Sequence, residues 1–404
     1  MGFSTFAGVN KVMSMIAFEE AYEMVIASAE TLGVEEIALQ LTLGRIMAEN
    51  VFSDLNMPPF NKAAVDGYAC RKTDLNSPLE VIEVIRAGQE PQKKVGPGQC
   101  SKVMTGGVVP EGADTVIMVE HTEEAGENRI RFNAEKTGTN ICYTGEDIRS
   151  GQKVLTKGTL IRPQEIAVLA SVGAVNPKVF KKPVVGMIST GDELVEPDEK
   201  PSLSKIRNSN AAQLLAQVER CGATPRYFGI ARDNEEDTRS KITLALNNSD
   251  MVLLTGGVSM GDFDYVPKVL DELGIGVKFK SLAVQPGRPT IFGMKKGKYL
   301  FGLPGNPVSS FVQFELLVKP LILSIMGNTY SPLVLQLPMG ETFQRKKAKR
   351  KSFIPVKIED GKVFPLEYHG SAHIHAYASA DGIVAVEIGN TSLEKGQIVD
   401  VRQI

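Results

Sequence analysis

The chain has 404 residues, too many for one ordinary hydrophobic core, so we expect three or four domains. A net charge of −2 argues against a global field that would recruit nucleic acid or an anionic membrane. Four scattered cysteines, the lack of an apolar run that could span a bilayer and the lack of a recognisable signal peptide predict a soluble, cytoplasmic protein with reduced thiols.

The pattern of apolar and turn-forming residues changes twice within the first 180 residues. Apolar residues recur every three or four positions over 17–32, which predicts a helix that Gly33 ends. Short β-rich runs separated by Gly, Pro and Asn follow. We therefore expect a discontinuous N-terminal, linking domain over 15–53 and 145–180, interrupted by an inserted β-rich domain over 54–144.

Strand and helix patterns alternate over 181–328, which predicts a doubly wound α/β domain. Buried strands are indicated by PVVGMIST, PRYFGIA, DMVLLTGG and KYLFGLPG. Helix signals follow each of them, with Asn208 or Ser209 as the N-cap of the first helix and Gly222 as its end. Residues 329–404 return to short β runs and predict a second small β domain.

Three predicted strands of the α/β domain lead into unusual loops, namely STGDELVEP, TGGVSMGDFDY and GLPGNPVSSF. Ligands of open α/β sheets bind at the carboxyl ends of strands, and the N–H groups of glycine-rich loops bind anions. Asp192, Glu193, Asp262 and Asp264 would supply oxygen ligands for Mg²⁺. Glycines and aspartates also make ordinary turns, but three such loops in one domain favour a phosphorylated, magnesium-dependent ligand.

Two further features point to an anion. Pro304 and Pro307 fix the backbone on either side of Gly305-Asn306, either to present N–H groups or simply to start a stiff helix. The basic run over 345–351 is either solvated or a basic edge that receives an anionic ligand from a neighbouring domain or subunit.

Several long motifs carry a resemblance over about residues 15–402. They occur in the order and approximate spacing of the molybdopterin molybdenumtransferases, the MoeA and gephyrin E-domain family: PPFNKAAVDGYA, MTGGVVPEGADTVIMVE, STGDEL, IRNSNAAQLLA, LLTGGVSMGDFDYV, QPGRPTIFG and GLPGNPVSSF. The resemblance implies an α/β multidomain fold. Its parts are a doubly wound molybdopterin-binding domain, an inserted β-rich domain, an elongated linking domain and a C-terminal small β-barrel-like domain.

The resemblance also implies an activity. Members insert molybdate into adenylylated molybdopterin with Mg²⁺ and release AMP and molybdenum cofactor. It implies a homodimer whose active site lies between the α/β domain of one subunit and elements of the other, with transient contact to the molybdopterin adenylyltransferase. Neither nucleic acid nor a membrane is implied as a partner.

Carried over position by position, the resemblance implies two sets of site residues. The catalytic set comprises Asp66, Thr105, Asp147, Glu193, Asp233 and Asp264, of which Glu193 and Asp264 would also bind the metal. The substrate-binding set comprises Gly256, Gly257, Ser259, Arg288, Pro304, Asn306, Pro307, Arg350 and Ser371.

The chain departs from the family in the segment that many members have as KPGKP. Here the segment is QPGRP, so Arg288 keeps one positive charge and Gln285 loses another. Ser281 also stands where some members have lysine, although Lys280 adjoins it.

A second departure concerns an arginine often found just after the phenylalanine of an R-x-x-F pattern. Ile354 and Pro355 follow Phe353 in this chain, so the arginine is absent, and Arg350, Lys351 or another basic residue of the run over 345–351 would have to substitute. Both departures affect the expected molybdate subsite more than the nucleotide and pterin sites.

Two other functions compete with the insertase. A non-catalytic dimeric molybdopterin-binding scaffold of the same fold would bind ligand without releasing AMP. A paralogue for the preceding adenylylation step is disfavoured, because minimal single-domain binders lack both β domains.

Overall fold

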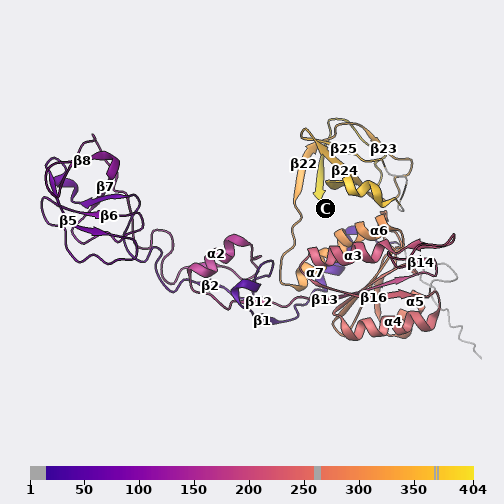
Figure 1. Cartoon of the computed structure of the whole chain (residues 1–404). Helices are drawn as coiled ribbons and strands as arrows, with labels where there is room; N and C mark the ends of the chain where they lie inside the picture. Colours follow the sequence, from indigo (N-terminus) through magenta and orange to yellow (C-terminus); the bar gives the residue numbers. More distant parts are fainter. Residues whose placement is uncertain (1–14, 259–264, 368–369, 371–372) are drawn as a thin grey trace, which may run out of the picture. The chain divides into compact units, whose positions relative to one another are not determined.

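The computed structural model describes residues 15–258, 265–367, 370 and 373–404. The chain forms two compact units (Figure 1). The first contains the chain up to residue 35, residues 44–48 and residues 178–404, and the second contains residues 36–43 and 49–177.

A six-stranded sheet organises the first unit, in the order β16-β13-β17-β21-β20-β18. Its strands are β13 (Val184–Thr190), β16 (Thr224–Ala231), β17 (Met251–Thr255), β18 (Gly276–Phe279), β20 (Ile291–Lys295) and β21 (Lys298–Leu303). The first four strands in this order are parallel, and β20 and β18 are antiparallel to their neighbours. The chain goes from β13 outward to β16 and then back to β17, so the strand order reverses between β13 and β17. The predicted doubly wound α/β fold is confirmed.

Helices cover both faces of this sheet (Figure 1). Met251 and Leu253 of β17 pack with α1 (Phe18–Ala27), α3 (Ser209–Arg220), α6 (Pro307–Gln313) and α7 (Lys319–Ile325). Val252 and Leu254 pack with α4 (Glu235–Asn248) and α5 (Val266–Glu272). Because side chains alternate along a strand, one apolar run serves both cores.

The first helix is shorter than its sequence predicts. The apolar periodicity extends over 17–32, but α1 ends at Ala27. The Tyr299 hydroxyl donates to the Ser28 carbonyl and accepts from the Glu30 N–H, both at 2.9 Å. These bonds to a strand far along the chain replace the helical bonds that residues 28–32 would otherwise make.

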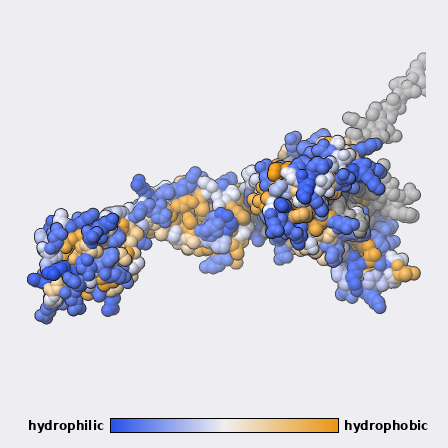
Figure 2. Space-filling view, turned by 90° about the horizontal axis from the view of Figure 1, so that it is seen from above, coloured by the Kyte–Doolittle hydropathy of each residue, from blue (hydrophilic) through white to orange (hydrophobic). Residues whose placement is uncertain are grey.

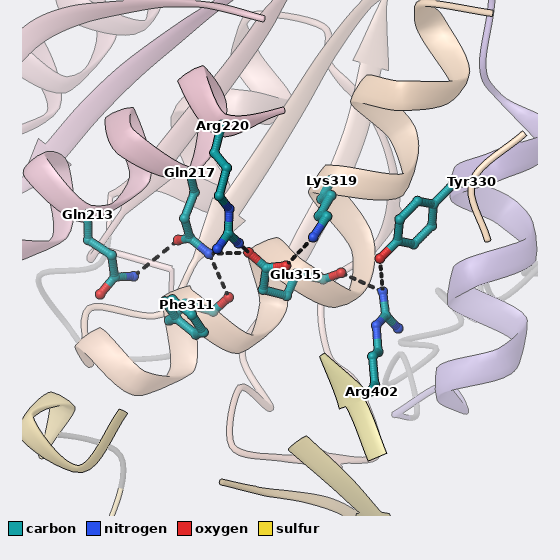
Figure 3. Close-up of polar contacts among 8 residues, drawn as sticks. All are labelled: Gln213, Gln217, Arg220, Phe311, Glu315, Lys319, Tyr330 and Arg402. Carbon is teal, nitrogen blue, oxygen red and sulfur yellow. Dashed lines mark hydrogen bonds and ion pairs between the residues drawn. The ribbon is translucent and has the colours of Figure 1, made fainter. Parts of the chain in front are cut away.

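The helix after β21 runs from Pro307 to Ile325 and changes to a π-helix, η4 (Phe314–Val318), between α6 and α7. It is long and apolar enough to cross a membrane, but 78% of it is buried inside the protein, as expected of a core helix. Glu315 lies in the π-helical segment with its side chain 1% exposed. Its carboxylate accepts from Gln217, Arg220 and Lys319, and its carbonyl accepts from Arg402 at 2.7 Å (Figure 3).

The C-terminal part of the first unit forms a second sheet, in the order β19-β24-β26-β28-β22 with β25 beside β24. The strands are β19 (Val284–Gln285), β22 (Val334–Pro338), β24 (Lys351–Glu359), β25 (Lys362–Pro365), β26 (Gly382–Val386) and β28 (Ile398–Gln403). β19 belongs to the QPGRP segment and pairs in parallel with β24. Short pairs complete the unit: β1 (Val34–Glu36) with β12 (Lys178–Phe180), β14 (Leu194–Val195) with β15 (Ile206–Arg207), and β23 (Phe343–Gln344) with β27 (Ser392–Leu393).

The second unit contains a six-stranded sheet in the order β7-β4-β6-β5-β9-β8. Its strands are β4 (Gly67–Cys70), β5 (Leu79–Ile85), β6 (Gln99–Val103), β7 (Thr115–Met118), β8 (Thr122–Glu124) and β9 (Arg129–Phe132). The unit also holds α2 (Pro163–Ser171) and two short pairs, β2 (Val51–Phe52) with β11 (Lys153–Leu155) and β3 (Lys62–Ala63) with β10 (Ile141–Cys142). Cys70 and Cys100 face each other across β4 and β6, and burial raises the pKa of each thiol to about 12, so both are protonated at neutral pH.

Candidate functional site

Three loops meet at the carboxyl ends of β13, β17 and β21, where the strand order reverses. A Cβ atom on Gly256 would lie 2.5 Å from the Thr190 carbonyl oxygen, and one on Gly305 would lie 3.5 Å from the Gly256 Cα. The Gly256 N–H also donates to the Leu303 carbonyl. Gly256 and Gly257 have φ values of +84° and +62°. Both the close approach and the left-handed backbone therefore require glycine in the TGG loop.

A cavity of about 430 Å³ opens where these loops meet, and polar and apolar residues both line it. Of the predicted site residues, Glu193, Asn306 and Pro307 line it. The Glu193 carboxylate lies over Gly191, because a Cβ atom on that glycine would approach its oxygens to 2.4 and 2.6 Å. Gly191 therefore leaves room for the carboxylate to fold back beside the cavity.

Asp233 is not among the residues that line this cavity but lies against Asp192, the neighbour of Glu193. Its carboxylate accepts from the Asp192 N–H at 3.0 Å, and the Asp192 carboxylate accepts from the Asp233 N–H at 3.2 Å. These reciprocal bonds hold the loop after β16 against the loop after β13. In this structure both carboxylates stabilise the loops that frame the cavity.

The predicted metal site is described only in part. Asp264, Ser259 and Ser371 lie outside the described residues, as does Asp262. Within 15–258, 265–367, 370 and 373–404, no three His, Cys, Asp or Glu side chains cluster so as to hold a metal ion. Mg²⁺ is commonly held by one or two carboxylates together with substrate phosphates and water, and the single Glu193 carboxylate at the cavity fits this pattern.

The QPGRP segment and the basic run lie beside each other. In the β19–β24 pair Val284 lies opposite Lys351, and Arg350 donates to the Val284 carbonyl at 3.3 Å. Gln285 and Arg288 are both exposed, and the Arg288 carbonyl accepts from the Leu282 N–H at 2.9 Å. Arg350 therefore contacts the strand that begins the QPGRP segment, and Arg288 lies in the turn that returns to Leu282.

Structural contacts occupy two other cations of the basic run. Lys351 forms ion pairs with Glu19 at 2.7 Å and Glu387 at 2.8 Å. Arg345 donates to the carbonyls of 350, 387 and 390 and to Ser352. Ile354 is 2% exposed and packs into the core of the C-terminal sheet, so that position could not present a cation to a ligand here. Lys351 is thus held in two ion pairs, whereas the described side-chain contact of Arg350 is with the Val284 carbonyl.

The second unit brings Asp66 and Thr105 together. One Asp66 carboxylate oxygen accepts from the Thr105 N–H at 2.6 Å and from its hydroxyl at 2.7 Å. Asp147 lines a cavity of about 680 Å³, together with Lys62, Phe60 and Cys142. Gly106, the residue after Thr105, also lines this cavity, whereas Asp66 and Thr105 do not. This second cavity has one cation, two carboxylates (Asp147 and Glu146) and an aromatic ring in its wall.

Asp66 should titrate at an unusually acidic pH. The Thr105 N–H and then its hydroxyl stabilise the ionised carboxylate, and both lower the pKa of Asp66 below that of an ordinary aspartate. We expect Thr105→Val to raise this pKa part of the way back, because the N–H bond remains. Carboxyl NMR titration would measure it, with Thr144→Val, whose hydroxyl bonds Asn61, as the control. An unchanged Asp66 pKa in Thr105→Val would contradict the assignment.

Some residues that line the first cavity are not among the predicted site residues. Asn208 is predicted only as an N-cap, which is confirmed because its side chain accepts from the Ala211 N–H. Arg207, Asn210 and Thr255 also belong to the wall. The available signal was the IRNSN motif itself, which places polar residues at the start of a helix facing the loop after β21.

Comparisons with known proteins match almost the whole chain. Family models match three segments: the MoeA N-terminal region (domain I and II) over 16–173, a probable molybdopterin binding domain over 186–324, and the MoeA C-terminal region (domain IV) over 339–404. A molybdopterin molybdenumtransferase of Bacillus subtilis is 36% identical and covers 91% of this chain and 89% of its own length. One from Staphylococcus epidermidis is 34% identical and covers 96% and 95%.

Solved structures agree with this result. Two structures of the molybdopterin biosynthesis MoeA protein of Pyrococcus horikoshii superpose with TM-scores of 0.81 and 0.83, at 34% and 29% identity. They cover 96% and 97% of this chain and 99% and 100% of their own. The chain therefore belongs to the molybdopterin molybdenumtransferase (MoeA) family.

Proposed function

We propose that this protein acts in molybdenum cofactor biosynthesis, where it inserts molybdate into adenylylated molybdopterin and releases AMP. The observation that carries the proposal is the convergence of three glycine-containing loops on one cavity at the point where the strand order reverses. Cleavage of an adenylate is a displacement at phosphorus, which positioning and electrostatic stabilisation accelerate without a catalytic triad.

Each loop has a role in this proposal. The backbone around Gly256 and Gly257 would hold a phosphate of the substrate, and the loop at Asn306 and Pro307 would fix its position. Glu193 would hold Mg²⁺ together with substrate phosphate oxygens. The ion would supply the positive charge that neutralises the phosphates during cleavage.

Molybdate would bind at Arg288 and Arg350. Molybdate is a tetrahedral dianion, and a guanidinium group presents several N–H donors to such an oxyanion. Arg350 is partly buried, and its guanidinium group already donates to the Val284 carbonyl. It would therefore lose less conformational freedom on binding molybdate than a solvated lysine of the same run. We therefore propose that Arg350 compensates for the charge missing at Gln285 and Ile354.

Arg350→Gln should raise the KM for molybdate about tenfold, because one charge-assisted contact to the dianion is lost. The KM for adenylylated molybdopterin should stay within about twofold of the wild-type value. Steady-state AMP release at varied molybdate would measure both. Lys349→Gln removes a neighbouring exposed charge and is the control. An equal KM rise in both variants would contradict a specific role for Arg350.

We also propose that the protein acts as a homodimer in the cytoplasm, with transient contact to the adenylyltransferase that supplies its substrate, and with neither nucleic acid nor a membrane as partner. Large apolar side chains are exposed on the part of the second unit that carries α2 and β2 (Figure 2). They include Leu41, Leu43, Phe52, Leu160 and Val175, which are 41–68% exposed. Apolar surface of this kind marks interaction sites, and a second copy would cover it.

The test is AMP release from adenylylated molybdopterin by the purified protein with Mg²⁺, with and without molybdate. Molybdate-dependent release with formation of active cofactor is the expected result. Tight binding without release would instead favour the dimeric scaffold. Release that does not need Mg²⁺ would remove the proposed role of Glu193.

A further inference from the structure

One residue in the wall of the first cavity has a side-chain oxygen without a partner. Asn210 lies in the first turn of α3, and its Nδ2 donates to the Gly305 carbonyl at 2.7 Å. Its Oδ1 is buried and accepts no hydrogen bond from any residue that the structure describes. Turning the amide over would set Oδ1 against the Gly305 carbonyl oxygen, so the contact with Gly305 fixes which atom is unsatisfied.

A buried acceptor without a donor is costly, and native proteins nearly always satisfy such groups. This acceptor belongs to a residue that lines the cavity together with Glu193 and Thr255. Arg207, a hydrogen-bond donor, belongs to the wall as well, so the wall presents both donors and acceptors. The Asn210 acceptor therefore matches one donor group of a ligand bound in this cavity.

We propose that Asn210 is a specificity-determining residue whose Oδ1 accepts a hydrogen bond from an exocyclic amino group on the heterocycle bound in this cavity. The identity of the ligand rests on the proposed function: adenylylated molybdopterin carries two such groups, one on its pterin and one on its adenine. Replacing that amino group by a carbonyl oxygen would set two acceptors against each other. A site built around a buried polar contact rejects such an analogue strongly.

The experiment compares two pairs of probes that differ at the amino group. One pair is AMP and inosine monophosphate, and the other is 6-carboxypterin and 6-carboxylumazine. Calorimetry or fluorescence would measure their binding to the full chain and to two variants, Asn210→Leu and Gln213→Leu. Gln213 is the matched control, because its amide lies one turn further along α3 and reaches the Pro307 carbonyl at 3.5 Å without lining the cavity.

In the wild type and in Gln213→Leu, the amino member of one pair should bind at least about tenfold more tightly than its oxo partner. In Asn210→Leu this preference should fall to within about twofold, because only the amino probe loses a contact. The pair that shows the effect identifies the ring: the nucleotide pair assigns the cavity to adenine, and the second pair assigns it to the pterin.

Two results would overturn the inference. One is a wild type with no preference in either pair. The other is an Asn210→Leu variant in which both members weaken equally and the preference survives, as a purely structural role at Gly305 would produce. These binding measurements need no turnover. A chain that discriminates between the probes but releases no AMP would thus lose the proposed function and keep the role of Asn210.

Discussion

Glu193→Gln is expected to lower molybdate-dependent AMP release by at least about a hundredfold at fixed Mg²⁺. Glutamine keeps the shape of the side chain beside Gly191 but loses the charge that would hold Mg²⁺ against the substrate phosphates. The Mg²⁺ concentration for half-maximal rate should rise as well. The loop should stay folded, because it is held by main-chain bonds such as the one from the Ile206 N–H to the Glu193 carbonyl at 2.8 Å. Rate measurements and thermal melting would test both statements.

Glu199→Gln is the matched control for this prediction. Glu199 lies in the connection between the parallel strands β14 and β15 and is exposed. Its described contacts are made by the main chain: its N–H donates to the Glu196 carbonyl at 3.0 Å, and its carbonyl accepts from Arg207 at 3.1 Å. It is absent from the residues that line the cavity. The control should keep its rate within about twofold of the wild type. A normal rate in Glu193→Gln, or an equal loss in both variants, would contradict the assignment of Glu193.

Much of the α/β architecture could be predicted because its signals are local. Runs such as 251–255 are apolar at every position, which is typical of parallel strands buried on both faces, and β17 is such a strand. Asn208 and Gly222 mark the ends of α3 where the sequence places them. The three loops at the carboxyl ends of the strands could also be identified, because their backbone conformation requires glycine and these glycines are visible in the local sequence.

Other features depend on partners far away in the chain. The early end of α1 is imposed by the Tyr299 hydroxyl, which is 271 residues from Ser28. The placement of Arg350 beside Gln285 depends on β19 pairing with β24, a register that no local pattern indicates. The unsatisfied oxygen of Asn210 follows from its contact with Gly305, 95 residues away. Such long-range contacts decide which residues of a motif face the ligand and which support the fold.

Glu315→Ala is the substitution that we expect to destabilise the first unit most, by about 3 to 5 kcal/mol. The carboxylate is 1% exposed and pairs with Arg220 and with Lys319, the latter at 2.8 Å (Figure 3). Truncation would leave the Lys319 ammonium, which is 20% exposed, without its counter-charge. Urea unfolding of the whole chain would measure the loss. Glu111→Ala breaks an exposed ion pair, in which the side chains of Lys94 and Glu111 are 65% and 78% exposed. This change should cost less than about 1 kcal/mol.

A double variant, Glu315→Leu with Lys319→Leu, separates the two sources of this loss. If the penalty in Glu315→Ala comes mainly from an unpaired buried charge, removing both partners should restore much of the stability, because an apolar pair of similar volume avoids desolvation altogether. Arg220 is 48% exposed and can turn its guanidinium group to water when the carboxylate is gone. A double variant as unstable as Glu315→Ala would instead show that the packing of the π-helical segment depends on the carboxylate itself, through its bond to Gln217.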